Sequence, residues 1–229
     1  MPETEMHNFA LPSMCILLTF LPGTSYPGAK EAGVGRSSGA LALTMRKPVM
    51  KDRVGAHLSI DSTIGDVLAH PAFAGFGRLI LPWDDRRADS NLRLRDIGTL
   101  LPYHSEVNPA DIVTALNRMI DDAISGNTIF YEFYTEAQKQ TDSTKRNTGL
   151  FFFRGKPGAP FAIVCPGGGF VYVASVHEGF PYAVQINKSG YNVFVLRYRA
   201  GSGGELAIQD LAAELPTLVR PGSRNDQGD

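Results

Sequence analysis

The sequence predicts an α/β protein, with a three-layer, mostly parallel sheet that opens with an antiparallel strand pair and follows a mostly helical or irregular N-terminal segment. Two aromatic-rich segments separated by a polar stretch predict the antiparallel pair. From Phe161 to Leu215 a buried strand, a helix, a second strand and a second helix follow one another. This alternation is typical of parallel strands joined by right-handed crossovers.

Residues 1–60 are expected to be a flexible lead-in or a targeting segment. Met14–Leu21 is apolar enough to form the core of a signal peptide, and the Gly- and Ser-rich stretch 23–39 looks flexible. However, Glu3 and Glu5 precede the apolar stretch where a signal peptide carries basic residues, so a cytoplasmic location is favoured over a secreted one. The stretch is also shorter than the about 20 residues that span a bilayer, so no membrane span is expected.

Residues 61–126 are predicted to form a helical N-terminal extension. Ser62 or Thr63 can cap a short helix that ends at His70, and a packed loop over 73–85 follows it. A longer helix begins with Asn108 as its N-cap, has proline at its first position and ends at Gly126.

The acidic residues of that longer helix are interpreted as a solvated face rather than as catalytic carboxylates. They are Asp111, Asp121 and Asp122. Charges on an amphipathic helix most simply face water or complement the helix dipole.

Residues 127–215 carry the predicted sheet. Strands are expected over Thr128–Tyr134 and Gly149–Phe153, joined by a polar, turn-like stretch over 138–147. A turn over 155–160 then leads into the buried strand Phe161–Cys165.

A helix, a strand and a second helix complete this region. They are expected over 177–190, 191–198 and 205–215, and residues 216–229 are expected to be a polar, disordered tail.

Three consecutive glycines, Gly167, Gly168 and Gly169, follow the buried strand directly. Glycines placed in this way let backbone N–H groups approach a reacting atom, as in the oxyanion hole of esterases. A tight strand-to-helix turn without a ligand is the alternative. A dinucleotide cradle is disfavoured because Tyr172 stands where its last glycine belongs.

The segment from Thr128 to Leu215 resembles the N-terminal portion of the α/β-hydrolase family. The resemblance is to its esterase and lipase branch with a Cys-Pro-Gly-Gly-Gly loop, similar to acetyl-xylan and feruloyl esterases, and it rests on the order of elements around Cys165-Pro-Gly-Gly-Gly-Phe170. The resemblance implies a serine-type carboxylic ester hydrolase that acts on a small-molecule ester.

The resemblance also implies roles for individual residues. Gly168 and Gly169 would supply the oxyanion N–H groups, while Gly167 and Phe170 would contact the substrate. Asp210 would be a structural residue on its helix.

A nucleophile is missing from the expected place. In the family, the serine lies in a Gly-x-Ser-x-Gly elbow after one further strand, and no such strand follows Leu215. The stretch Gly35–Gly39 matches the five-residue pattern but lacks the strand and helix around it, and Ser175 and Ser202 match no better. We therefore expect a truncated chain that is inactive alone.

No histidine is expected to act as a catalytic base or as a metal ligand. His177 follows the glycines and is expected at most to line the pocket, or to be a solvated residue at a helix start. None of the five histidines has metal-ligand spacing, so no metal and no cofactor are expected.

The composition excludes other partners. The 22 basic and 23 acidic residues nearly cancel, which gives no electrostatic support for a nucleic-acid partner. The two cysteines are too few for a disulfide-stapled fold, and Cys165 is interpreted as an inert small hydrophobe rather than a reactive thiol. The oligomeric state stays open.

A non-catalytic binding module that reuses half of a hydrolase sheet is the alternative function. It predicts a cooperatively folding protein whose last strand is protected. The truncated hydrolase instead predicts that Tyr191–Tyr198 is an open apolar edge.

Overall fold

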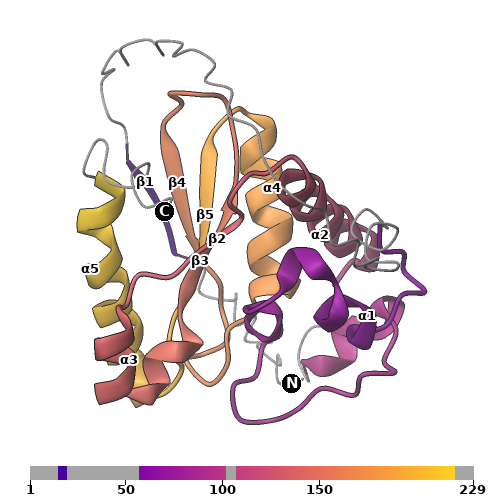
Figure 1. The fold of residues 1–229 in the computed structure, drawn as a ribbon, viewed down its shortest axis with the longest axis horizontal. Coiled ribbons are helices and arrows are strands. Elements are labelled where there is room, and N and C mark those ends of the chain that lie inside the picture. The colour runs from indigo at the N-terminus through magenta and orange to yellow at the C-terminus, as the bar shows by residue number, and fades with distance from the viewer. Residues whose placement is uncertain (1–14, 20–56, 102–106, 220–229) are drawn as a thin grey trace, which may run out of the picture.

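The computed structural model describes residues 15–19, 57–101 and 107–219, and gives side chains for 57–101 and 107–214. Its centre is a five-stranded sheet in the order β1-β4-β5-β3-β2 (Figure 1). The strands are β1 (Cys15–Thr19), β2 (Phe130–Tyr131), β3 (Gly149–Phe153), β4 (Phe161–Cys165) and β5 (Asn192–Arg197). The α/β class is confirmed.

The sheet is mixed rather than mostly parallel, which corrects the expectation from the sequence. Only β4 and β5 pair in parallel among the described strands, and the pairs β1–β4, β3–β5 and β2–β3 are antiparallel. The β4–β5 pair is joined by helix α4 (Phe180–Lys188), and a parallel pair needs a crossover connection of this kind.

Helices cover both faces of this sheet. On one face lie α4 (Phe180–Lys188) and, beyond it, α2 (Pro109–Ile124), while α5 (Glu205–Val219) lies on the opposite face (Figure 1). Successive strand residues alternate between the two faces: Phe151, Phe153, Val164, Val193 and Val195 belong to the core under α4, and Leu150, Ile163 and Leu196 to the core under α5. Both faces are therefore closed, as the apolar runs of β3 and β4 require.

The N-terminal extension packs on the α4 side. It contains α1 (Ile64–Ala69), 3₁₀ turns at Pro71–Phe73, Gly77–Ile80 and Leu94–Leu100, and α2. Thr63 and Asp66 form a capping box at α1, and the Asn108 side chain accepts from Ala110 N at the start of α2. These two caps confirm the predicted helix starts.

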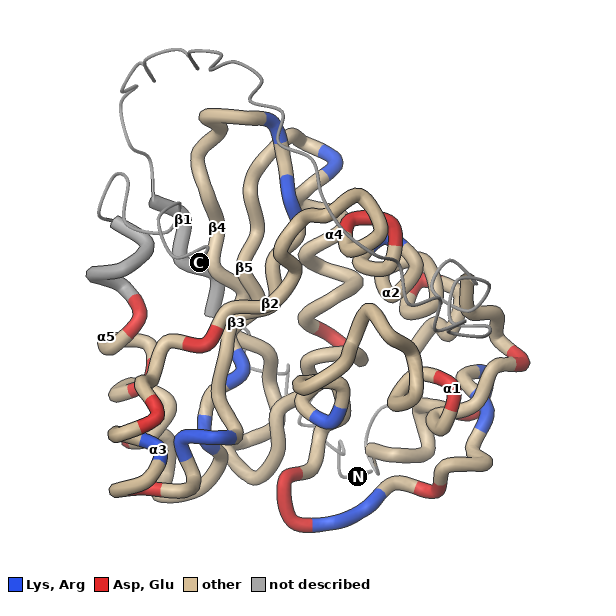
Figure 2. Tube along the Cα trace, in the orientation of Figure 1, with Lys and Arg blue, Asp and Glu red and all other residues tan. Residues whose placement is uncertain are grey.

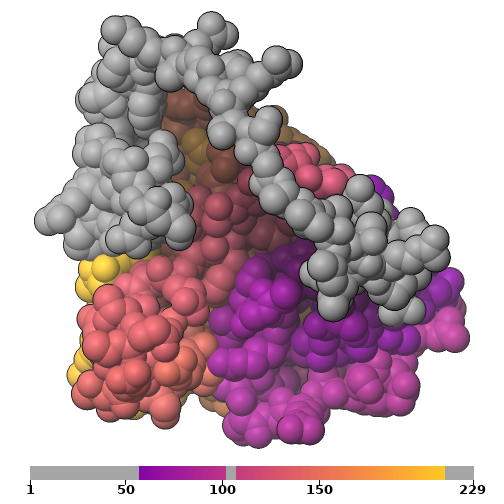
Figure 3. Space-filling view, viewed as in Figure 1, coloured from indigo at the N-terminus to yellow at the C-terminus, as the bar shows by residue number. Residues whose placement is uncertain are grey.

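Side chains of the extension also touch the sheet region directly. The space-filling view shows residues 57–101, in purple and magenta, lying against the salmon segment around α3 (Figure 3). Arg78 Nη2 donates to the Arg146 carbonyl oxygen at 2.8 Å across this boundary. This hydrogen bond joins the extension to the segment between β2 and β3.

Three element boundaries differ from those predicted. The strand predicted over Thr128–Tyr134 is limited to Phe130–Tyr131. The predicted polar turn contains helix α3 (Glu136–Thr141) and a 3₁₀ turn (Ser143–Asn147), because Thr135 forms a capping box with Gln138. Helix α5 runs four residues beyond its predicted end at Leu215.

One acidic residue of α2 is also placed differently. Asp122 is largely buried and accepts from Arg118 Nε at 3.1 Å, so the interpretation as solvated face is wrong for it. Asp121 remains exposed, where its carboxylate lies 2.7 Å from His57 Nε2.

The predicted open edge at Tyr191–Tyr198 is not present. Strand β5 lies between β4 and β3 and pairs with both, so its backbone groups are used on each side.

No charged residue falls within β3 or β4, and charges gather instead around α3, α5 and the loops (Figure 2). Among the described helices, none combines the length and the apolar character needed to cross a bilayer.

Candidate functional site: the glycine loop at the end of β4

The glycine loop, residues 166–170, leaves the carboxyl end of β4. Its backbone dihedral φ is 137° at Gly168, 57° at Gly169 and 61° at Phe170. Phe170 is not a glycine, so its left-handed conformation is uncommon and costs conformational energy. Such backbone strain clusters at functional sites, which makes this loop the first candidate.

The N–H groups of the loop have different partners. Gly167 N donates to Glu178 Oε2 at 3.0 Å. The N–H groups of Gly168 and Gly169 have no acceptor among the described residues, and Gly168 is half-buried while Gly169 is exposed. Two adjacent backbone donors are therefore available to a ligand.

Close packing explains two of the three glycines. A Cβ on Gly168 would lie 2.0 Å from the Tyr172 carbonyl oxygen, and one on Gly167 would lie 2.8 Å from Glu178 Oε2. A Cβ on Gly169 would meet nothing within 4 Å. A side chain at Gly167 or Gly168 would therefore overlap neighbouring atoms, whereas a Cβ at Gly169 would lie in open space.

The segment after the loop holds it in place. Ala174 N donates to the Gly167 carbonyl oxygen at 3.0 Å, and Val171 N donates to that of Gly168 at the same distance. Glu178, which holds Gly167 N, lies in a π-helical turn, Ser175–Gly179, that precedes α4. Residues 177–179 of this turn fall within the helix predicted over 177–190 and depart from α-helical geometry.

The histidine and serine of this turn do not form a catalytic pair. His177 is buried, with Nε2 3.0 Å from the Ile97 carbonyl oxygen, so it anchors the N-terminal extension and is not a solvated residue. Ser175 is fully buried. The Nε2 atom of His177 is therefore engaged by the extension.

The loop after β5 packs against the glycine loop. Gly201 N donates to the Phe170 carbonyl oxygen at 2.6 Å, and a Cβ on Gly204 would lie 2.8 Å from the Phe170 ring. The Tyr198 hydroxyl donates to the Pro166 carbonyl oxygen at 2.7 Å, and burial raises the Tyr198 pKa. Phe170 remains 42% exposed despite these contacts.

The chain topology places this loop beside a position for one more parallel strand. Helix α4 connects β4 to β5 over one face, and α5 leaves β5 over the opposite face (Figure 1). Because crossovers are right-handed, a parallel strand reached through α5 would return past β4 and pair with the edge of β4 that does not face β5, which we call the β4 outer edge. Ligands of open α/β sheets bind where strand order reverses in this way.

Strand β1 occupies the β4 outer edge in the structure. It pairs antiparallel with β4 over its whole length, from Cys15 opposite Cys165 to Thr19 opposite Phe161. β1 lies within the apolar stretch Met14–Leu21. Residues 1–14 and 20–56 of the predicted lead-in lie outside the described residues, and so does the Gly35–Gly39 pattern.

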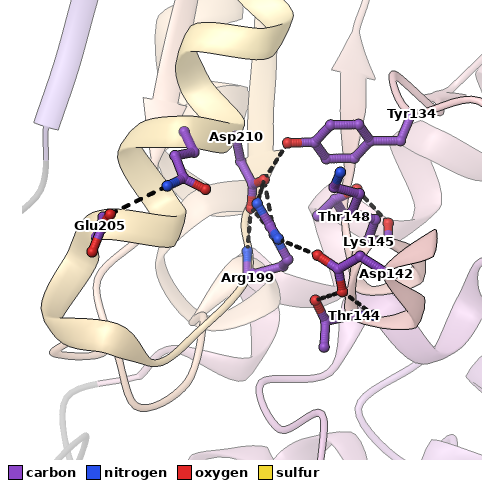
Figure 4. Close-up of polar contacts among 9 residues, drawn as sticks. Tyr134, Asp142, Thr144, Lys145, Thr148, Arg199, Glu205 and Asp210 are labelled. Carbon is purple, nitrogen blue, oxygen red and sulfur yellow. Dashed lines mark hydrogen bonds and ion pairs between the residues drawn. The ribbon is translucent and has the colours of Figure 1, made fainter. Parts of the chain in front are cut away.

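A buried ionic cluster lies between α5 and the end of β5 (Figure 4). Asp210 is fully buried and accepts from Arg199 N, Nε and Nη2 at 2.7–3.2 Å, and from the Tyr134 hydroxyl at 2.7 Å. Arg199 Nη1 also donates to Asp142 Oδ2 at 2.8 Å. Asp210 thereby joins α5, the end of β5 and the segment after β2, which gives it a structural role.

The cluster shifts the proton affinity of its members. Burial, followed by the hydrogen bond to Asp210, raises the pKa of Tyr134 to about 12. The pKa of the Arg199 guanidinium is raised by its hydrogen bonds to Asp210, against the opposing effect of burial. The pKa of Asp142 is lowered, first by the Thr144 hydroxyl that donates to it. These groups keep their ordinary charges at neutral pH.

Arg197 ties the N-terminal extension to the end of β5. Its side chain is fully buried, donates to the Val173 carbonyl oxygen at 2.9 Å and reaches Asp84 at 2.5 Å. Sequence patterns did not identify Arg197, Arg199 or Tyr134, because each acts through a partner distant in sequence.

In the parts of the chain with described side chains, no three His, Cys, Asp or Glu residues gather closely enough to hold a metal ion.

A scan of protein-family models and searches of curated proteins and of solved structures find no match to this chain.

Proposed function

We propose that this chain carries the oxyanion-binding half of a serine-type carboxylic ester hydrolase of the α/β-hydrolase fold. The observation that carries the proposal is the pair of adjacent N–H groups, on Gly168 and Gly169, with no acceptor among the described residues. They lie at the carboxyl end of a parallel strand, beside the position where strand order would reverse.

The chemistry of ester hydrolysis fits these two donors. Attack on the ester carbonyl converts its oxygen into an oxyanion, which fixed N–H groups stabilise without reorganising. Each such donor is worth about a hundred- to a thousandfold in rate in enzymes where one has been removed. The open space in front of Gly169 leaves room for the acyl group, and the exposed Phe170 ring supplies an apolar contact.

The described strand on the β4 outer edge is antiparallel, whereas the proposed fold carries its nucleophile on a parallel strand there. In the proposed fold, a serine elbow ends the strand that pairs with the β4 outer edge, so its hydroxyl would face the glycine loop. Strand β1 holds this edge in the antiparallel direction. We therefore propose that this chain alone has no serine-dependent turnover.

The substrate class is a small-molecule carboxylic ester. The resemblance to acetyl-xylan and feruloyl esterases favours a carbohydrate-linked acetyl or aromatic ester. The pocket for the alcohol group is not assigned, because such pockets are built largely from loops rather than from the sheet.

The test is hydrolysis of a short-chain aryl acetate by the purified chain. We expect no turnover that an active-site phosphonate abolishes, and no serine labelled by that phosphonate in a mass spectrum. Phosphonate-sensitive turnover with one labelled serine would refute the proposed absence of a nucleophile. The labelled peptide would then identify the serine responsible.

One observation favours the second candidate, a non-catalytic binding module. The strand that the truncated hydrolase was expected to expose is paired on both sides, since β5 lies between β4 and β3. This candidate predicts a single cooperative unfolding transition by circular dichroism and intrinsic fluorescence. Non-coincident transitions, with early loss of the region around β4, would contradict it.

A further inference from the structure

We propose that Cys15 and Cys165 form a reversible cross-strand disulfide that locks β1 onto the β4 outer edge. This inference goes beyond ester hydrolysis and does not depend on it. The observation behind it is the register of the two strands, in which Cys15 and Cys165 stand directly opposite each other. They are the only two cysteines of the 229 residues.

The backbone geometry of such a pair suits a disulfide. Directly opposed residues in antiparallel strands have Cα atoms about 4.5–5.5 Å apart, within the about 4.4–6.8 Å that a disulfide spans. A shift of one residue would place the two positions on opposite faces of the sheet. The pairing is therefore a property of this register, not of two cysteines somewhere on neighbouring strands.

The position of Cys165 makes it reachable by a small oxidant. Its side chain is half-buried and packs beside the core under α5, rather than in the fully closed core under α4. It is the last residue of β4, immediately before Pro166 and the glycine loop. A cross-link there would end one residue from the loop.

The redox step balances with a low-molecular-weight disulfide, such as oxidised glutathione, as the oxidant. One cysteine thiolate attacks this disulfide, forms a mixed disulfide and releases one small thiol. The thiolate of the second cysteine then attacks the protein sulfur of the mixed disulfide and releases the second small thiol. Two protein thiols are oxidised, and one small disulfide is reduced to two thiols.

The lock controls which strand can pair with β4. In the oxidised protein β1 is held on the β4 outer edge, which protects an apolar strand from pairing with another chain. In the reduced protein the covalent link between β1 and β4 is absent, and the edge can open to a parallel strand. The thiol state thus governs access to the edge beside the glycine loop.

The test uses the full chain oxidised with glutathione disulfide and analysed by non-reducing mass spectrometry and peptide mapping. We expect a monomer that has lost two hydrogens, with one linked peptide pair containing both cysteines. The matched control combines Cys15→Ser with Ile16→Cys, which moves the thiol to the position opposite Val164. We expect the internal cross-link of this control to form with a yield at least about tenfold lower than in the wild type, because positions 16 and 165 lie on opposite faces of the sheet.

A denatured reference separates register from simple proximity in sequence. In concentrated urea both proteins should cross-link to the same extent, since no register exists there. Equal yields under native conditions, or glutathione adducts on both cysteines without an internal link, would overturn the proposal. Slower hydrogen exchange of β1 and β4 amides in the oxidised protein than in the reduced one would support the lock, and unchanged exchange would contradict it.

Discussion

Replacing Gly168 with alanine tests the tight packing of the glycine loop. The new Cβ would lie 2.0 Å from the Tyr172 carbonyl oxygen, and the backbone has φ of 137°. The positive φ costs an L-residue about 1–2 kcal/mol, and relief of the overlap about 1–3 kcal/mol more. We expect the free energy of unfolding to fall by about 2–5 kcal/mol in total.

The matched control is Gly169→Ala in the same loop. Gly169 also has positive φ, at 57°, but its Cβ would meet nothing within 4 Å. The strain is partly offset by the lower entropy of the unfolded chain, so we expect a loss of about 1 kcal/mol or less.

Equilibrium urea unfolding of both variants measures the difference. A Gly168→Ala protein that loses clearly more stability than Gly169→Ala, with an unchanged dependence on urea, supports the described packing. Equal losses in the two variants would refute it, because the contact with Tyr172 is the main feature that separates them.

Two further predictions concern the buried ionic cluster. Asp210→Asn removes the fully buried carboxylate that pairs with Arg199 and leaves the guanidinium with the less buried Asp142, so we expect urea unfolding to show a loss of about 3–5 kcal/mol. The exposed control Glu205→Gln on the same helix should change stability by less than about 0.5 kcal/mol. Equal effects would contradict the role of Asp210. Because the Tyr134 pKa is raised from 10.0 to about 12 in the folded protein, its contribution to stability is present below pH 10 and is lost as the pH rises toward 12. Unfolding measured across this range should therefore lose less stability in Tyr134→Phe than in the wild type, and identical losses would refute the linkage.

Local patterns predicted the elements that fold by local rules. Strands β3, β4 and β5 appear as short apolar runs, and α2 follows from the cap at Asn108 and the proline after it. The helix α3 was missed although its signal was present, since Thr135 and Gln138 have the spacing of a capping box.

Long-range pairing could not be predicted in the same way. The position of β5 between β4 and β3 depends on β3 pairing with a strand that begins 39 positions after its own end. The antiparallel docking of β1 joins segments nearly 150 positions apart, about the length of a whole domain. The burial of Arg199 with Asp210 likewise depends on how α5 packs on the sheet.

In the candidate site, too, the local pattern could be predicted and the contacts between separate segments could not. The glycines could be found from the sequence, because consecutive glycines after a buried strand are a local pattern. Which of their N–H groups remain available depends on Glu178, whose carboxylate takes the Gly167 donor from a turn eleven positions later. The sequence predicted that all three glycines take part in the site. In the structure the Gly167 N–H is bonded to Glu178, whereas those of Gly168 and Gly169 have no acceptor among the described residues.

The most direct test of the oxyanion proposal is an NMR titration of backbone amides with a small tetrahedral oxyanion such as methylphosphonate. We predict saturable downfield shifts of the Gly168 and Gly169 amide protons, while the Gly167 proton, already bonded to Glu178, stays in place. Unchanged Gly168 and Gly169 resonances at saturating phosphonate, or shifts confined to lysine and arginine side chains, would contradict the proposal that these glycines form an oxyanion-binding site.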